Sequence, residues 1–314
     1  MKKILFLILF LSLSFFSQNT FACDSCGCTL SKISDNVQNA AQKKRWFFDL
    51  TFEQQNWKVK NAAEAHTLHH QGHDFHDKTH EEFYHFTLGA NLSEAVAVLA
   101  ELPYVVRGSL DVEHHSTLGR KQQSEGIGDL NLIGIYKFLV QGDDFLGINA
   151  GVKLPTGQTK EKDTTGDIFE PELQPGSGSA DYPLGIVYHK EIGAAALSDN
   201  VSYVIKIKGA HQFQYGDLFF ASLNADYTMN PESKAFQTKI GLDMTFHNSK
   251  KDRVARERDD DSGETSFFAG PGLNVKANEN FSVFGNILFP VYQNTGGVHQ
   301  KLLNQWTGGV KIVW

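Results

Sequence analysis

The sequence predicts an all-β protein, an antiparallel up-and-down transmembrane β-barrel of about twelve strands with a short N-terminal periplasmic segment. Three observations support this prediction. Apolar and polar residues alternate along most of the chain after residue 45, long and short connections alternate between these stretches, and the chain begins with an export signal. Alternation with period two is the pattern of a strand that has one apolar and one polar face.

Residues 1–22 have the features of a secretory signal peptide. Lys2 and Lys3 form a basic start, residues 4–16 form an apolar core too short to span a bilayer, and Ala22 ends an acceptable cleavage site. Removing these two lysines takes the net charge from −7 to −9, and a negatively charged chain is a poor partner for nucleic acid. No later stretch has the length of a transmembrane helix, so we expect an exported protein.

Cleavage after Ala22 would leave Cys23 at the start of a periplasmic segment. The alternative is a lipoprotein, although Phe21 stands where a lipidation signal needs a small residue. The thiolates of Cys23, Cys26 and Cys28 can bind Zn or Cu(I). In an oxidising periplasm, the other interpretation is a disulfide with one free or lipidated thiol.

The barrel is predicted at 45–314, after a periplasmic segment at 23–44. The expected strands are 45–58, 82–92, 95–108, 127–139, 145–156, 182–192, 201–214, 218–229, 235–247, 264–277, 281–293 and 301–314. The long connections between them are 59–81, 109–126, 157–181 and 248–263. Long outer loops that alternate with short periplasmic turns are typical of outer-membrane barrels. A soluble β-sandwich is the alternative, but it has no reason to segregate loop lengths in this way.

The final strand has one apolar and one polar face. Trp306, Val310, Ile312 and Trp314 fall on one side, and Gln305, Thr307, Gly309 and Lys311 fall on the other. An aromatic last residue resembles the closing strand of bacterial outer-membrane barrels. That resemblance implies recognition by the barrel assembly machinery, and a location in the cell outer membrane beside its lipid and lipopolysaccharide.

The face opposite the apolar one should line the lumen. Charged side chains in a membrane need water or partners, so we place them inside. The expected lumen residues are Glu101, Arg107, Asp129, Lys153, Lys206, Lys208, Asp226, Lys239, Asp243 and Lys311. A barrel of about twelve strands is wider than a filled barrel and narrower than an open porin. Two interpretations therefore stay open: a narrow polar conduit, or a salt-bridged interior that conducts nothing.

An expected outer loop is rich in histidine. His66, His69, His70, His73, His76 and His80 lie close together in sequence. Several imidazoles at short spacing can converge on Zn or Cu, and no other cofactor is indicated. The alternative is a polar, solvated loop of biased composition.

Four short motifs together resemble a known family. They are Gly126–Leu130, Gly151–Gly157, Leu173–Ser179 and Pro290–Gln293. In this order, they resemble the outer-membrane family associated with the meta pathway of phenol degradation, whose members are described as transporters. The resemblance covers about 82–314 and implies a twelve-stranded barrel that passes a small solute. The histidine-rich loop and the cysteine cluster depart from the family pattern.

Enzyme motifs are absent from the sequence. There is no G-x-S-x-G elbow, no H-E-x-x-H and no phosphate-binding glycine loop, so we do not expect an enzyme. The first hypothesis is a porin-like outer-membrane transporter for small solutes, either a hydrophobic or aromatic compound or a metal ion. The second is a non-conducting outer-membrane protein that binds metal through the histidine loop and the cysteine cluster.

Overall fold

The structure is a computed structural model that describes residues 40, 45–58, 78–111, 120–233, 236–260, 262–295 and 300–314. The expected signal peptide and the cysteine cluster lie outside these residues. Within the described ranges, no helix is long and apolar enough to cross a bilayer.

The described chain is built mainly of long strands. The strands of the main sheet are β1 (Trp46–Lys58), β2 (Lys78–Asn91), β3 (Val96–Asp111), β4 (Arg120–Ile127), β5 (Leu130–Gln141), β6 (Asp144–Leu154), β7 (Tyr182–Ile192), β8 (Ala195–Ile205), β10 (Leu218–Thr228), β11 (Gln237–Ser249), β14 (Glu264–Lys276), β15 (Phe281–Thr295) and β16 (Lys301–Val313). Most of them exceed ten residues, which is long enough to cross a bilayer at a tilt.

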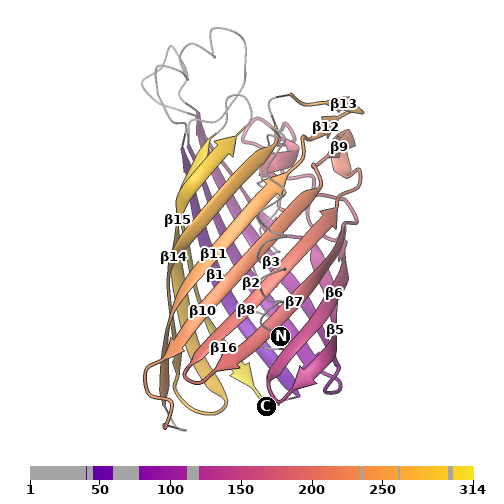
Figure 1. Cartoon of the computed structure of the whole chain (residues 1–314). Coiled ribbons are helices and arrows are strands. Elements are labelled where there is room, and N and C mark those ends of the chain that lie inside the picture. Colours follow the sequence, from indigo (N-terminus) through magenta and orange to yellow (C-terminus); the bar gives the residue numbers. More distant parts are fainter. Residues whose placement is uncertain are drawn as a thin grey trace.

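These strands form one antiparallel sheet that closes into a barrel (Figure 1). The order is β2-β1-β16-β15-β14-β11-β10-β8-β7-β6-β5-β3-β4, and a further pairing of β2 with β3 closes the ring. Because β4 and β5 follow one another and both pair with β3, they are two halves of one wall strand. The wall therefore has twelve strands, which confirms the predicted all-β barrel.

β1 joins the two ends of the sheet. It pairs along its length with β2 on one edge and with β16 on the other. Where β1 starts and β16 ends, Trp46 and Trp314 exchange two backbone hydrogen bonds of 3.0 Å. A bilayer offers no hydrogen-bond partner to an open strand edge, so this pairing is what permits insertion.

The two ends of the barrel differ in their connections. Tight turns such as 142–143 and 193–194 lie at the same end as Trp314, and the long connections lie at the other end (Figure 1). Outer-membrane barrels have short periplasmic turns and long extracellular loops, so we name the two ends accordingly. The extracellular end also carries a small sheet of β9 (Phe213–Gln214), β12 (Arg253–Val254) and β13 (Glu257–Arg258). Two short 3₁₀ turns, η2 (Pro171–Leu173) and η3 (Ala210–Gln212), complete the elements.

One expected strand, 201–214, is wrong in its bounds. The true strand, β8, begins earlier because its turn lies at Gly193, whose φ of 64° suits a tight hairpin. The expected bounds left Asp199 and Asn200 in the connection before residue 201, but they lie within β8, and the Asn200 side chain is buried inside the barrel. Polar residues are tolerated there because they face the interior rather than lipid.

Two other boundaries also differ from the expectation. β2 begins at Lys78, so His80 belongs to a strand and not to the preceding loop. The strand expected at 127–139 is interrupted at Gly128 and Asp129, between β4 and β5. β6 ends at Leu154, so among the described strands β4 pairs with β3 alone, and the segment 155–181 lies beside its other edge. There, Gln158 N donates a hydrogen bond of 2.9 Å to Ile127 O.

The outer face of the wall is apolar. Tyr136, Ile148 and Ile186 stand in register on β5, β6 and β7, and they are 52%, 43% and 55% exposed. The intervening residues, such as Ile135 and Asn149, are buried. Alternate residues therefore face the surrounding lipid and the interior, as the period of a strand requires.

We predict that an arginine on the outer face blocks insertion. Ile148→Arg should destabilise the folded barrel in lipid by up to about 2–4 kcal/mol, because the charge would face the hydrocarbon layer. Urea titration of the protein folded in vesicles measures this loss. Val254→Arg is the matched control, since Val254 is equally exposed but belongs to the extracellular β12. Equal losses for the two variants would show that the β6 face does not contact lipid.

Candidate functional site

The inner face of β1, β2 and β3 is polar. Its buried charged and ionisable side chains are Asp49, Glu53, Glu81, His85, Glu101 and Arg107. An ion pair and a histidine–carboxylate contact join neighbouring strands: Arg107 Nε lies 2.9 Å from Glu81 Oε1, and His85 Nδ1 lies 2.8 Å from Glu101 Oε1. The predicted lumen residues Glu101 and Arg107 are thus buried in the interior, and both are already paired.

Apolar side chains occupy much of the remaining interior, which we call the apolar sector. It includes Leu99, Ile133, Ile135, Phe145, Val187, Val204, Leu218 and Phe220. The sequence reasoning missed this sector. In β5, Leu132 and Tyr136 face outward while Ile133 and Ile135 face inward, so the strand shows no alternation. A continuous apolar run is the signal of a strand that is buried on both faces, and it was present in the sequence.

The apolar sector is narrowed at its periplasmic end by a residue that precedes the barrel. Ala40 is 1% exposed and belongs to the same apolar cluster as Ile135 and Phe145. Its carbonyl oxygen accepts a hydrogen bond of 2.8 Å from Lys137 Nζ, and this ammonium also lies 5.5 Å from the centre of the Phe145 ring. Ala40 therefore lies inside the barrel and takes up part of its width.

Three of the four sequence motifs meet at one buried carboxylate, that of Asp129. It accepts hydrogen bonds from Gly157 N at 2.9 Å, from Ser177 N at 2.9 Å and from Ser177 Oγ at 2.6 Å. Gly157 and Gly176 approach so closely that a Cβ added to either would come within 2.7 Å of the other's backbone. The motifs thus form one structural unit, which we call the Asp129 anchor.

Lys153 completes the anchor from β6. Its Nζ lies 2.6 Å from Asp181 Oδ2, 3.5 Å from Asp129 Oδ2 and 2.7 Å from Ser177 Oγ. All four side chains are buried, so the charges compensate one another away from water. The predicted lumen residues Asp129 and Lys153 therefore hold the segment 155–181 against the wall.

The same segment extends to inward-facing side chains near the extracellular end. Arg107 Nη1 donates hydrogen bonds to Gln174 O and, at 3.0 Å, to Glu172 O. Ser124 Oγ donates to Leu173 O. Leu173 and Gln174 are buried, so this part of the segment lies against the inner wall and reduces the opening.

The two lysines expected after β7 differ in position. Lys206 is buried, and its Nζ lies 5.4 Å from the centre of the Tyr215 ring. Lys208 is exposed and lies beyond the end of β8. Its expected lumen position depended on a strand at 201–214, whose bounds are wrong, so Lys208 is not part of the site.

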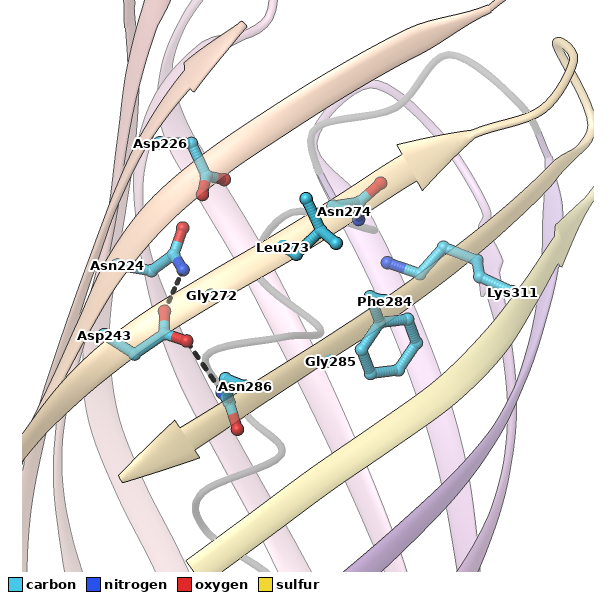
Figure 2. A pocket seen from close by; sticks show the side chains of 10 residues that line it. All are labelled: Asn224, Asp226, Asp243, Gly272, Leu273, Asn274, Phe284, Gly285, Asn286 and Lys311. Carbon is cyan, nitrogen blue, oxygen red and sulfur yellow. Dashed lines mark hydrogen bonds between the residues drawn. The ribbon is translucent and has the colours of Figure 1, made fainter. Parts of the chain in front are cut away.

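The remaining predicted residues lie on the inner face of β10, β11 and β16. Asp226, Asp243 and Lys311 line a hollow on the inner side of β10, β11, β14, β15 and β16 (Figure 2). The Asp243 carboxylate accepts hydrogen bonds from Asn224 Nδ2 and, at 2.7 Å, from Asn286 Nδ2. Lys239 is half-buried and pairs in register with Asn274, another residue of this hollow.

The expected metal ligands fall largely outside the described residues. Cys23, Cys26, Cys28, His66, His69, His70, His73 and His76 all do. His80 is described, and its ring nitrogens contact Asn56 Oδ1 at 2.9 Å and Glu82 Oε1 at 2.8 Å. Among the described side chains, no group of three or more His, Cys, Asp or Glu could hold a metal ion. Binding of Zn or Cu by the loop or by the cysteines stays a prediction.

Asp217 links the segments at the extracellular end of the barrel through hydrogen bonds. The Asp217 carboxylate, just before β10, accepts hydrogen bonds from Lys206 N at 3.0 Å, from Tyr203 Oη at 2.9 Å and from Lys250 Nζ at 3.0 Å. Burial raises the pKa of Asp217, but these three hydrogen bonds outweigh burial and hold its pKa below the ordinary value. The contact therefore stabilises the loops only while Asp217 is ionised.

We predict that removing the Asp129 carboxylate releases the segment 155–181. Asp129→Ala leaves three donors without this acceptor and removes one of the two carboxylates beside the buried Lys153 ammonium, at a cost of about 3 kcal/mol. Limited proteolysis within the segment should become faster, and single-channel conductance should rise. Asp167→Ala, on an exposed part of the same segment, is the control. If both variants are cut at the wild-type rate, the anchor does not restrain the segment.

We predict acid-induced release of the loops held by Asp217. Because its folded pKa is lowered, the stabilisation is complete above the unfolded value of about 4 and is lost as the pH falls through the folded value. Hydrogen exchange at the Lys206 amide, corrected for the intrinsic rate, should accelerate below about pH 4. Asp217→Asn should remove this pH dependence, whereas Glu257→Gln, in the exposed β13, should retain it. An unchanged profile in Asp217→Asn would assign the effect to another group.

Solved structures share this fold at low sequence identity. The COG4313 outer membrane channel from Pseudomonas putida F1 is 16% identical, with a TM-score of 0.63, over 87% of this chain and 97% of that chain. The translocator domain of the autotransporter NalP from Neisseria meningitidis is 10% identical, with a TM-score of 0.51, over 92% of this chain and 96% of that one. No curated protein matches the sequence. At these identities, the likeness concerns the fold alone.

The protein is a closed barrel of the outer membrane. A family model described as "Putative MetA-pathway of phenol degradation" matches residues 71–297. This range includes the Asp129 anchor and most of the wall, and it is more than half of the sequence. The chain therefore belongs to the family of that description, as its four motifs indicated.

Proposed function

We propose that the protein is an outer-membrane channel for small hydrophobic compounds, and not an enzyme. The observation that carries this proposal is the apolar sector of the interior, in which Ile133, Ile135, Phe145 and Val187 are buried on the inner side of the wall. A channel for ions or sugars would be lined by polar groups that replace the water around the solute. An apolar wall instead stabilises a hydrophobic solute through burial of its surface.

The family description and one structural neighbour support the same proposal. The family is named for phenol degradation, and the Pseudomonas putida neighbour is described as an outer membrane channel. A small aromatic compound combines an apolar ring with few polar groups, so it suits an interior with one apolar and one polar wall. The two narrowed ends, at segment 155–181 and at Ala40, would restrict the channel to small solutes.

The proposal includes the surroundings of the barrel. Its outer face meets membrane lipid, and we propose that the exposed Arg253 and Arg256 at the extracellular end bind lipopolysaccharide phosphates. We also propose that the assembly machinery reads Trp314, whose side chain is exposed beside β1. These partners follow from charge and position, and each requires its own binding measurement.

Uptake by whole cells tests the proposed function. Cells with the protein in their outer membrane should take up radiolabelled toluene several-fold faster than cells without it, and uptake of the sugar alcohol ribitol should rise much less. Ile135→Asn should reduce toluene uptake because it places an amide in the apolar sector. Thr245→Asn is the matched control, since Thr245 is also buried but lies outside the apolar sector, opposite Ser222 of β10.

Heat-modifiable mobility on gels shows that each variant is folded before its uptake is compared. Equal toluene uptake with and without the protein would overturn the proposal. Faster ribitol than toluene uptake would replace it with a channel for polar solutes.

A further inference from the structure

Lys311 stands apart from the other buried charges of the interior. Its side chain is only 6% exposed, yet its Nζ makes no hydrogen bond or ion pair with any described residue. Its nearest aromatic contact is the Phe284 ring, whose centre lies 5.7 Å from Nζ. Burying an ammonium without an acceptor is costly, so the position calls for an acceptor that the described protein does not supply.

The carboxylates near Lys311 are engaged elsewhere. Asp243 is held by the amides of Asn224 and Asn286. Asp49 is opposite Lys311 in the register of β1 with β16, and Asp49 and Asp226 each have other interactions. Lys311 is therefore the charged group of this hollow that lacks an acceptor, although the surrounding field is mixed and not strongly positive.

The hollow around Lys311 offers two further recognition elements (Figure 2). The Phe284 ring borders it on β15, beside the lysine. Asn286 Oδ1 is a buried acceptor without a hydrogen-bond partner among the described residues, whereas Nδ2 of the same amide donates to Asp243. An ammonium, an aromatic ring and a free acceptor on neighbouring strands form a set that complements a ring with an acid group and a donor group.

We propose that this hollow, the Lys311 pocket, is a binding site for a small aromatic carboxylate that also carries a hydroxyl group. The carboxylate accepts hydrogen bonds from the Lys311 ammonium, the ring packs on Phe284, and the hydroxyl donates to Asn286 Oδ1. A full negative charge fits better than a neutral oxygen because it offsets the desolvation of the ammonium.

The position of the pocket gives it a role in transit. Lys311 lies three residues from the last residue, Trp314, and so near the periplasmic end of the barrel. A solute that has passed segment 155–181 and the apolar sector would meet the pocket just before release. This inference rests on the proposed function, since a site inside the barrel is useful only if small aromatic solutes enter it.

Uptake of 4-hydroxybenzoate by the full-length protein in vesicles, at pH 7, tests the pocket. Uptake by the wild type should be saturable, and its methyl ester, which has the same ring and hydroxyl but no charge, should not compete. Lys311→Met should raise the half-saturation concentration at least about tenfold, the size expected for losing a charged hydrogen-bond partner. Lys311→Arg should restore most of the affinity, because it keeps the charge and the donors.

The matched control is Lys276→Met, which removes another lysine on the inward-facing side of β14 but outside the pocket. It should leave the half-saturation concentration unchanged. Equal effects of Lys311→Met and Lys276→Met, or equal competition by acid and ester in the wild type, would overturn the proposed site. The acid–ester comparison needs no variant, so it decides the matter even if Lys311→Met does not fold.

Toluene uptake separates failure of the site from failure of the channel. If toluene enters normally while 4-hydroxybenzoate uptake is not saturable, the pocket is wrong and the channel stands. If neither compound enters through the wild type, the proposed function fails and the pocket fails with it.

Discussion

Closure of the backbone hydrogen bonds is the constraint on which the rest of this structure depends. Lipid cannot satisfy a strand edge, so the first strand must meet the last one, and β1 does so along β16. Twelve strands closed in this way leave an interior too wide for wall side chains alone to fill. Backbone from outside the wall strands occupies part of that space: Ala40 at one end and segment 155–181 at the other.

Many charged side chains inside the barrel form hydrogen bonds with the backbone of Ala40 and of segment 155–181. Arg107 donates to the carbonyl groups of residues 172 and 174, and Lys137 donates to that of residue 40. Asp129 accepts from the backbone N–H groups of Gly157 and Ser177. These charged groups satisfy peptide groups that strand pairing does not satisfy, which buried loops require. The motifs at 126–130, 151–157 and 173–179 are thus tied together by one structural need, although they are far apart in sequence.

The sequence predicted the wall well because a strand in a bilayer repeats a simple rule. β7 was predicted with the bounds that it has, and in β3 the exposed Val98, Leu102 and Tyr104 oppose Glu101 and Arg107 as expected. Alternation gives no signal where both faces of a strand are apolar. β5 is apolar on both faces, so the alternating pattern could not show that Ile133 and Ile135 face inward. Asn200 was misread as a turn because local propensity was weighed without knowing that the barrel interior accepts amides.

The site was harder to predict than the wall because inward position does not tell whether a charge is engaged. Alternation placed Glu101, Arg107, Asp129, Lys153 and Lys311 on the inner face alike. Four of them are bound to partners on other strands or on segment 155–181, contacts that depend on sequence separations of 16 to 67 residues. Only the three-dimensional structure separates these structural charges from Lys311, whose ammonium has no such partner among the described residues. A charge inside a barrel is therefore weak support for conduction, and a buried charge that lacks a partner is the stronger indication of where a solute binds.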